Sequence, residues 1–413
     1  MAKILFKNIG KLINVRDIEA PLRGASLLEL PIVQNAWLMV EDGLISAFGP
    51  MPTIPRNVAT ISNALDLTGR LLLPCWCDSH THLVFAASRE GEFVEKIKGT
   101  SYAEIAAKGG GIINSANRLN QFTEDELFNL AWKRLTQVRK MGTGAIEIKS
   151  GYGLSTMGEL KMLRVIKRLK EKSGMLIKST FLGAHAYPLQ FKNDHQGYIR
   201  MIIEEMLPKI SAERLADYVD VFCEKDFFSN EETEQVCRAA MSHGLKVKLH
   251  ANQLSSSGAV QTGVRLGALS VDHLENMDDG AITTLSNTTT IGTLLPSAAF
   301  FLRMQYPPAR RLIDAGAAVA LATDYNPGSS PSGNMNLVIS LACIKMKMLP
   351  EEAINAATIN GAFAIEVGKE TGSICQGKKA NLIVTQPVPA LEYLPYSFGE
   401  NWIESVMING EFV

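Results

Sequence analysis

The chain has 413 residues, of which 46% are hydrophobic and 20% are charged, and its net charge is −1. This length suits a barrel with an accessory domain, and the composition is that of a globular protein with a large core. The near-zero charge gives no bulk attraction to nucleic acid or to an anionic membrane, and no run of about 18 apolar residues predicts a membrane span. We therefore expect neither a nucleic-acid nor a membrane partner.

Cysteine usage indicates a reducing compartment. The six cysteines are sparse and lie mostly in apolar segments, whereas a secreted disulfide scaffold would be short and dense in cysteine. The opening residues alternate polar and apolar like a strand and carry no signal-peptide pattern. We expect reduced, buried thiols in a cytoplasmic protein. The cysteines are Cys75, Cys77, Cys223, Cys237, Cys343 and Cys375.

The two ends of the chain have the same character. Residues 1–70 are short strand-like segments separated by Gly and Pro, and residues 366–413 repeat this pattern. Asn409-Gly410, before a final apolar pair, is a hairpin signal. We predict that residues 1–70 and 366–413 together form one small composite β-sandwich domain.

The middle of the chain, residues 71–365, alternates short apolar strands with amphipathic helical segments. Eight repetitions of this pattern predict an α/β fold with a closed parallel (β/α)₈ barrel of the TIM type. An open doubly wound sheet is the runner-up, but it requires a phosphate-binding Gly-rich turn after its first strand, and none is found. The eight strand candidates are 71–78, 143–150, 178–185, 218–224, 246–251, 269–275, 289–296 and 318–324.

Two segments between these strands are interpreted by their composition. The helical segment 161–172 has cations on one side and apolar residues on the other, which favours a solvated outer face of the barrel over a nucleic-acid patch. The segment 86–115 contains Gly109-Gly110-Gly111 and is interpreted as a long loop with a flexible turn. We hypothesise that this loop closes over a substrate.

Polar side chains follow the predicted strands at the end where such barrels carry their chemistry. His80 and His82 end the first strand, and side chains two apart in an extended strand point the same way, so both project into the barrel mouth. His250 ends the fifth strand and Asp324 ends the eighth. Imidazole and carboxylate ligands suit a divalent transition metal, so we predict one metal ion held by these four residues.

The predicted ligand set indicates hydrolytic chemistry. Three neutral imidazoles and one carboxylate leave a divalent ion with net positive charge, which lowers the pKa of a bound water towards roughly 7. Asp324 can then ligate the metal and also take the proton of the water. His273, near the end of the sixth strand, can hydrogen-bond the water or a substrate carbonyl. Zinc and iron(II) both suit these ligands.

The order of these residues resembles the amidohydrolase superfamily, with HxH on the first strand, His on the fifth and sixth, and Asp on the eighth. The segments TINGAFAI and GSICQGKKANLIV also resemble its closing helix and its return to a β-sandwich. The similarity is closer to the imidazolonepropionase family and covers the barrel in chain order. The resembling segments are HTHLVFAASREGEF, the GGGI loop, IEIKSGYGL, FLGAHAYP, VKLHANQ, LSVDHLE and ATDYNPGSSPSGNM.

The resemblance implies hydrolysis of the cyclic amide of 4-imidazolone-5-propanoate to N-formimidoyl-L-glutamate in L-histidine degradation, by a homodimer. The guanidinium fork of Arg89 suits the propanoate carboxylate or the carbonyl edge of this small-molecule substrate. Asn326, Gly328 and Ser329 resemble a cradle for the glutamate-like end. The remaining residues that the resemblance assigns to substrate binding are Tyr152 and His185.

One position departs from the family pattern. Many family members have Glu three residues after the strand-five His, and here that position is Gln253. An amide cannot serve as a general base at neutral pH, but Gln253 can still hydrogen-bond the imidazolone ring. We therefore expect Asp324 to take the proton, with help from His273.

Three alternatives remain open at this point. A cytosine- or guanine-deaminase-like enzyme of the same superfamily would use a similar single-metal set. A two-metal, dihydroorotase-like enzyme would need a bridging ligand on the fourth strand, where Glu224 and Lys225 lie near the end. A non-catalytic barrel protein would be expected to lose ligands, yet this chain retains all four.

Overall fold

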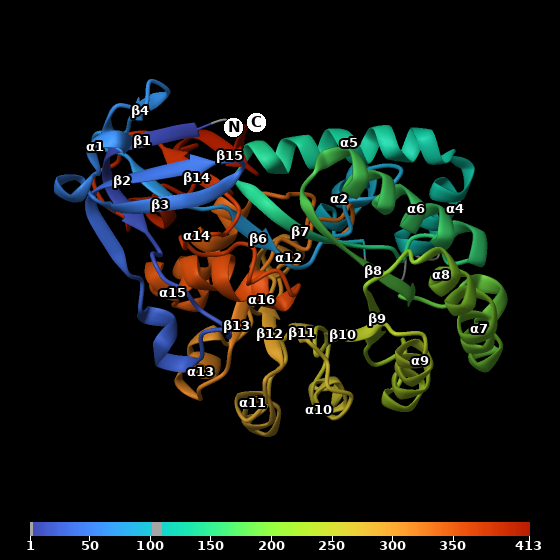
Figure 1. The fold of residues 1–413 in the computed structure, drawn as a ribbon. Helices are drawn as coiled ribbons and strands as arrows, with labels where there is room; N and C mark the ends of the chain where they lie inside the picture. The colour runs from blue at the N-terminus through green and yellow to red at the C-terminus, as the bar shows by residue number, and fades with distance from the viewer. Residues whose placement is uncertain (1–2, 101–109) are drawn as a thin grey trace.

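The computed structural model describes residues 3–100 and 110–413, and these form two sheets with surrounding helices (Figure 1). The first sheet is the predicted barrel. Its neighbouring strands are parallel and follow chain order from β6 to β13, which confirms the expected (β/α)₈ architecture. The strands are β6 (Trp76–Asp78), β7 (Thr143–Lys149), β8 (Leu176–Ala184), β9 (Tyr218–Cys223), β10 (Lys246–Ala251), β11 (Ser270–His273), β12 (Ile291–Leu294) and β13 (Val319–Leu321).

The barrel closes at a seam just beyond the ends of β6 and β13. The backbone N–H of Asp324 donates to the carbonyl of His80 at 3.0 Å, and that of His82 donates to the carbonyl of Tyr325 at 2.9 Å. Thr323 donates from its backbone and from its hydroxyl to the buried carboxylate of Asp78. The seam therefore brings two segments far apart in sequence, both with predicted metal ligands, side by side.

Helices cover the outside of the barrel, and α9, α10, α11 and α13 follow one another around β9–β13 in Figure 1. The larger ones begin at capping residues that the sequence supplies. Thr123 and Glu126 form a capping box at the start of α5, and Ser155 caps α6, which ends at Gly174 in the left-handed conformation. The helices are α1 (Arg56–Ala59), α2 (Glu90–Ile97), α4 (Gly111–Gln121), α5 (Glu124–Lys140), α6 (Thr156–Ser173), α7 (His195–Met201), α8 (Leu207–Glu213), α9 (Asn230–Ser242), α10 (Ala259–Arg265), α11 (Asp279–Ser286), α12 (Pro296–Leu302), α13 (Ala309–Asp314), α14 (Met335–Met346), α15 (Pro350–Asn355), α16 (Gly361–Ala364) and α17 (Tyr393–Tyr396).

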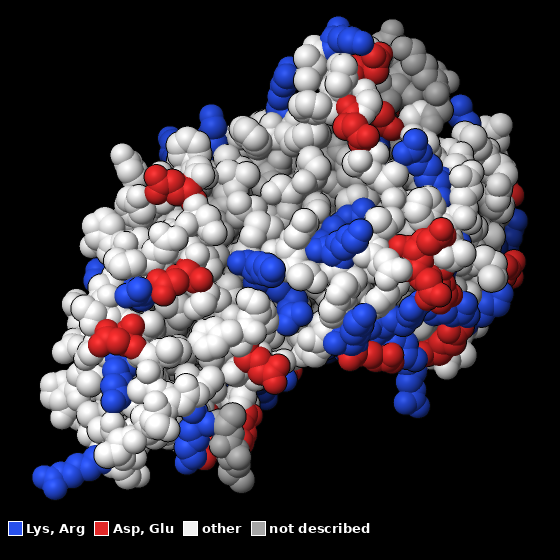
Figure 2. All heavy atoms as spheres, turned by 90° about the horizontal axis from the view of Figure 1, so that it is seen from above, with Lys and Arg blue, Asp and Glu red and all other residues white. Residues whose placement is uncertain are grey.

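The basic segment 161–172 lies within α6, whose apolar side is buried. Two of its arginines are paired with acids on neighbouring helices: Arg164 with Glu213 at 2.6 Å and Arg168 with Asp125 at 2.7 Å. Figure 2 shows cationic and acidic side chains interspersed over the face seen from above. The cations of α6 thus belong to a mixed-charge outer face of the barrel.

The second sheet is mixed and is built from both ends of the chain. Its strands follow the order β16-β15-β14-β5-β1-β2-β3, with β4 paired to β1. The predicted hairpin joins β15 and β16, since Asn409 and Gly410 both have positive φ (51° and 80°), as a two-residue turn requires. The strands are β1 (Lys3–Ile13), β2 (Ile32–Glu41), β3 (Leu44–Pro50), β4 (Ala64–Asp66), β5 (Leu71–Pro74), β14 (Leu382–Thr385), β15 (Ile403–Ile408) and β16 (Glu411–Phe412).

The strand expected over 71–78 is divided between the two sheets. Leu71–Pro74 pairs with β1 and β14 in the terminal sheet, and Trp76–Asp78 begins the barrel. Between them, the backbone N–H of Cys75 donates to the carbonyl of Asn381. One continuous apolar run thus serves both sheets, and the only mark in its sequence at the point of division is Pro74, the last residue of β5.

The segment 86–115 is less loop-like than expected. It contains α2 and the first turns of α4, which begins at Gly111. Residues 101–109, including Gly109 of the predicted flexible turn, lie outside the described residues. In the described part of the chain, no helix is long and apolar enough to cross a membrane.

Candidate metal centre and active site

A cavity of about 860 Å³ opens at the carboxyl ends of the barrel strands. His80 is fully buried, and every other residue predicted to bind the metal or the substrate or to act in catalysis lines this cavity. Two cations that also line it, Lys96 and Arg303, were not singled out from the sequence. The predicted site residues that line the cavity are His82, Arg89, Tyr152, His185, His250, Gln253, His273, Asp324, Asn326, Gly328 and Ser329.

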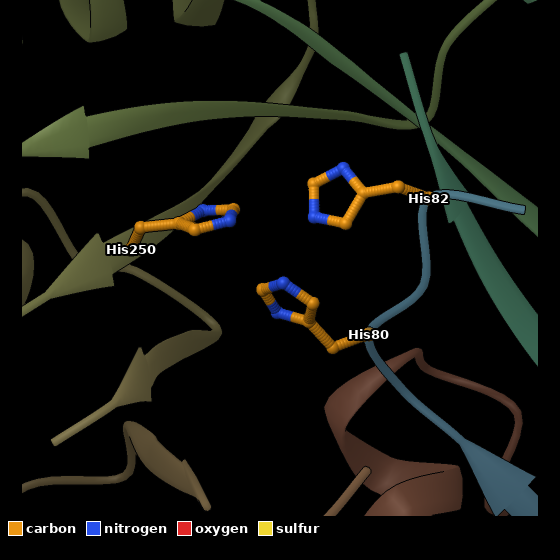
Figure 3. Close-up of side chains that lie close together, drawn as sticks. All are labelled: His80, His82 and His250. Atoms are coloured by element: carbon orange, nitrogen blue, oxygen red, sulfur yellow. The ribbon is translucent and has the colours of Figure 1, made fainter. Parts of the chain in front are cut away.

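Three imidazoles converge at the base of the cavity (Figure 3). His80 and His82 lie in the segment after β6, and His250 lies in β10. One ring nitrogen from each lies within 4.8 Å of the others. Figure 3 shows the three rings pointing toward a common centre, which is the arrangement a metal ion requires of its ligands.

Asp324 lies beside this cluster, across the barrel seam. Its Oδ1 is 3.5 Å from Nε2 of His80 and 3.4 Å from Nε2 of His82. Two ligand atoms that each lie about 2.1 Å from a tetrahedral ion are about 3.4 Å apart, so these separations suit ligands of one ion. His80, Asp324 and His273 form a second group within 4.8 Å.

The donor chemistry of the cluster fits a divalent metal. Nδ1 of His80 is 2.6 Å from Asp272 and Nδ1 of His250 is 2.9 Å from Asp220, so the other ring nitrogen of each faces the centre. Nε2 of His80 is buried and has no hydrogen-bond partner. Burial, and then the charge of Lys149, lowers the pKa of His80, and burial also lowers that of His250 despite Asp220. Both rings are therefore neutral, which is the form of imidazole that can bind a metal.

The backbone itself is unusual at the two residues expected to move protons. Both His273 and Asp324 have left-handed backbone, with φ of 86° and 54°. Such conformations are costly for side chains of this kind and cluster at functional sites. They turn the chain at the ends of β11 and β13 so that both side chains enter the cavity.

His273 has an acidic partner that the sequence analysis missed. Nδ1 of His273 is 3.5 Å from the fully buried carboxylate of Glu275. Burial alone would lower the pKa of His273, but the charges of Glu275 and then Asp324 outweigh it and raise that pKa. The position of Glu275, two residues after a strand-end histidine, was the available signal.

Arg89 is fixed by a carboxylate on its own helix. Its Nε and Nη2 donate to Glu92 at 2.9 and 2.6 Å, and the other oxygen of Glu92 accepts from the backbone N–H of Gly111 at the start of α4. A side chain at Gly328 would place its Cβ 2.4 Å from Nη1 of Arg89. Glycine at this position therefore lets the guanidinium lie against the loop after β13.

Tyr152 and His185 flank the histidine cluster. The ring of His185 stacks on that of His82, with centroids 5.5 Å apart, and Tyr152 lies 5.6 Å from His185. The turn that carries Tyr152 is held by Glu159, whose buried carboxylate accepts from the N–H groups of three residues in this turn, at 2.7–3.0 Å. The sequence analysis named Tyr152 but missed Glu159.

The loop after Asp324 is organised by Asn326. Its carbonyl oxygen accepts from the backbone N–H groups of Gly328 and Ser329 at 2.7 and 2.8 Å, while its amide donates to Oγ of Ser329. That hydroxyl in turn donates to Oδ2 of Asp324 at 3.2 Å. The donors expected to cradle a substrate are thus engaged within the loop, and they tie it to Asp324.

The two residues considered for a second metal lie apart from the cluster. The carboxylate of Glu224 accepts from the backbone N–H of Leu254 and the hydroxyl of Ser255, so it holds the loop after β10. Lys225 lines the cavity mouth. Glu224 belongs to neither of the groups among the described residues that could hold a metal ion.

Comparison with known proteins first identifies the class of protein to which this chain belongs. Residues 71–413 match the amidohydrolase family. The fold alone is shared with solved structures such as a guanine deaminase from C. acetobutylicum, with a TM-score of 0.71, 16% identity and full coverage of both chains. An adenosine deaminase from Xanthomonas campestris gives a TM-score of 0.69 at 16% identity, over 99% of this chain and 92% of the other. The class is that of hydrolases acting on C–N bonds.

Relatives that match this chain over almost their full length identify a family within this class. An imidazolonepropionase of Christiangramia forsetii is 52% identical, over 99% of this chain and all of its own length. An imidazolonepropionase of Flavobacterium johnsoniae is 53% identical over 99% of both chains. The chain belongs to the imidazolonepropionase family of amidohydrolases.

Proposed function

We propose that this protein adds water across the cyclic amide of 4-imidazolone-5-propanoate and releases N-formimidoyl-L-glutamate, a step of L-histidine degradation, as a cytoplasmic homodimer. The observation that carries the proposal is the 52–53% identity, over almost the entire chain, to proteins named imidazolonepropionase. A cavity that combines a histidine–aspartate cluster with several cations suits a substrate with one amide to cleave and one carboxylate to hold.

In this proposal one divalent ion, zinc or iron, is held by His80, His82, His250 and Asp324. The ion supplies Lewis acidity, which makes water a nucleophile near neutral pH and polarises the amide carbonyl. The buried neutral imidazoles and the adjacent carboxylate support this ligand set. Two of the imidazoles are oriented for it by Asp220 and Asp272, which accept from their Nδ1–H groups.

The protein's own residues then move the proton. Asp324 takes it from the attacking water, because its Oδ1 faces the cluster and Gln253 cannot act as a base. His273, whose pKa the neighbouring carboxylates raise, donates to the carbonyl oxygen as negative charge develops there. When the ring C–N bond breaks, the proton passes to the departing ring nitrogen, so the nitrogen does not leave as an anion, and the new carboxylic acid ionises to the carboxylate of the product.

The remaining residues position the substrate. Arg89, held in a fixed orientation by Glu92, binds the propanoate carboxylate or the carbonyl edge through its guanidinium fork. Gln253 hydrogen-bonds the ring edge. Tyr152 and His185 contact the ring of the substrate. The loop of Asn326, Gly328 and Ser329 cradles the glutamate-like end, and a substrate group there replaces hydrogen bonds that these donors otherwise make within the loop.

The test is to incubate the purified protein with freshly prepared 4-imidazolone-5-propanoate and to follow the loss of ring absorbance. We expect rapid loss that stops on chelation, with N-formimidoyl-L-glutamate as the product. Asp324→Asn, assayed with its metal content measured, should lose at least about 10³-fold in turnover. A native, metal-loaded protein that does not exceed the spontaneous rate would overturn the substrate assignment.

A further inference from the structure

Five ionisable side chains form a fully buried layer beneath the histidine cluster. They project from four strands of the barrel, β7, β9, β10 and β11, and each is 0% exposed. Three carry negative and two carry positive charge, so the charges are nearly balanced inside the barrel. We call this layer the charged floor. Its members are Glu147, Lys149, Asp220, Lys248 and Asp272.

Lys149 is the cation at the centre of the charged floor. Its Nζ is 2.6 Å from Oε1 of Glu147, 2.8 Å from Oδ2 of Asp220 and 3.6 Å from Oδ2 of Asp272. Burial alone would lower the pKa of Lys149, but the carboxylates, Asp220 first, raise it. The three carboxylates thus favour the charged form of the lysine.

The carboxylate oxygens that contact Lys149 are the same atoms that hold two of the proposed metal ligands. Oδ2 of Asp220 is 2.9 Å from Nδ1 of His250, and Oδ2 of Asp272 is 2.6 Å from Nδ1 of His80. One ammonium group thus joins both imidazoles through two shared oxygen atoms. No other cation among the described residues forms an ion pair with both carboxylates.

The charge of Lys149 has a physical consequence for the imidazoles. Each shared carboxylate oxygen lies between the ammonium group and an imidazole Nδ1, so the cation holds the carboxylate in place on one side while the imidazole contacts it on the other. A carboxylate held in this place accepts from Nδ1–H, which fixes the tautomer and leaves the lone pair of Nε2 facing the metal position. The orientation of His80 and His250 therefore depends on a shared counter-ion.

We propose that Lys149 is a positioning residue of the metal centre: its buried ammonium group clamps Asp220 and Asp272 and through them presets His250 and His80 for metal binding. This inference rests on the proposed metal centre. According to this inference, strand β7 contributes to metal affinity although it supplies no proposed ligand.

Lys248 provides a matched comparison within the same layer. It is equally buried, contacts the other oxygen of Glu147 and donates to the carbonyl of Ser79 at 3.0 Å. Within the described chain it forms no ion pair with Asp220 or Asp272. Removal of either lysine deprives Glu147 of one cation, but only removal of Lys149 releases the carboxylates that hold the imidazoles.

The experiment compares two double variants that leave the net charge of the floor unchanged, Lys149→Met with Glu147→Gln and Lys248→Met with Glu147→Gln. Each protein is stripped of metal, and its affinity for zinc is measured by competition with a chromophoric chelator. Thermal unfolding of the metal-free forms reports any general loss of stability. The cobalt(II)-loaded forms report ligand geometry through their visible absorption.

We expect the Lys149 double variant to bind zinc about 10- to 100-fold more weakly than the native protein and to show an altered cobalt spectrum. The Lys248 double variant should retain affinity within about threefold, even where its metal-free form is equally destabilised. Lys149→Arg, which restores a cation, should recover part of the affinity.

Equal losses of affinity in the two double variants, or unchanged affinity without Lys149, would overturn the inference. Because no substrate is used, a failed substrate assignment leaves the result standing. A native protein that binds no divalent ion would instead overturn the metal centre itself.

Discussion

The floor and the wall of the cavity are built in different ways. The charged floor lies on strands, is fully buried, and has its charges paired at short distances. The wall comes from helix α2 and from the loops after β7 and β13, where Arg89 and the Asn326 loop are partly exposed and held by local partners. Under the proposed function this difference separates two tasks, because metal binding depends on barrel register, while substrate selection depends on loops and a helix outside the barrel strands.

The largest effect is expected at His250, whose imidazole contacts Asp220 of the charged floor. His250→Asn removes one proposed ligand and leaves Asp220 without its imidazole. We expect loss of tight metal binding and a fall in turnover of at least about 10³-fold. Metal analysis beside the assay of 4-imidazolone-5-propanoate checks this, with the chelated native protein as reference. Full turnover with normal metal content would contradict the role of His250 as a metal ligand, and with it the contrast between floor and wall.

A smaller effect is expected for Glu275, an acid that lies beside His273 and is not one of the proposed metal ligands. Glu275→Gln should lower turnover about 10- to 100-fold while metal content stays unchanged, because the imidazole loses the charge that orients and protonates it. Glu352→Gln is the matched control, since Glu352 is also buried but pairs with Arg310 on the outer helices. Equal losses in the two variants would contradict a specific role for Glu275.

A change in the wall should act on substrate binding alone. Arg89→Met should raise KM for 4-imidazolone-5-propanoate about 10- to 100-fold without changing zinc affinity. The KM of Arg89→Lys should lie between those of the native protein and Arg89→Met, because lysine keeps the positive charge but lacks the guanidinium fork. Steady-state kinetics and chelator competition measure the two quantities. Arg164→Met, which removes an ion pair on the outer face of α6, should leave both unchanged. Weaker metal binding in Arg89→Met would show that wall and floor are coupled.

The smallest effect is expected at Gln253. Gln253→Glu introduces a carboxyl that accepts a proton only when ionised, so the pH–rate profile should gain a limb that rises through the pKa of this carboxyl, with less than about tenfold change at pH 7. Gln253→Met adds no titrating group and should keep the shape of the native profile. An unchanged profile in Gln253→Glu would place the residue away from the proton path.

The sequence predicted the barrel because its signals are local and regular. Eight apolar strands alternate with helices, and polar residues such as His250 and Asp324 stand at strand ends, where side-chain alternation and barrel topology bring them together. The loop residues Arg89 and Asn326 were predicted only through family resemblance, because irregular segments have no period. The assignment of roles to all these residues stays a prediction.

Other features depend on contacts between distant strands. Lys149 and Asp272 are polar residues within strands that are otherwise mostly apolar. Their ion pair is set by the register of the closed barrel, so the local sequence of neither strand predicts it. The division of 71–78 between two sheets likewise depends on a partner strand, β14, that lies at the far end of the chain.

That partnership has a consequence during synthesis on the ribosome. β5 is bordered on one side by β1 and on the other by β14, so an edge of the terminal sheet stays open until Leu382–Thr385 has been translated. Open strand edges recruit other strands. A nascent chain of this protein therefore carries an exposed edge through the whole synthesis of the barrel, and we expect it to depend on chaperones until its last strands emerge.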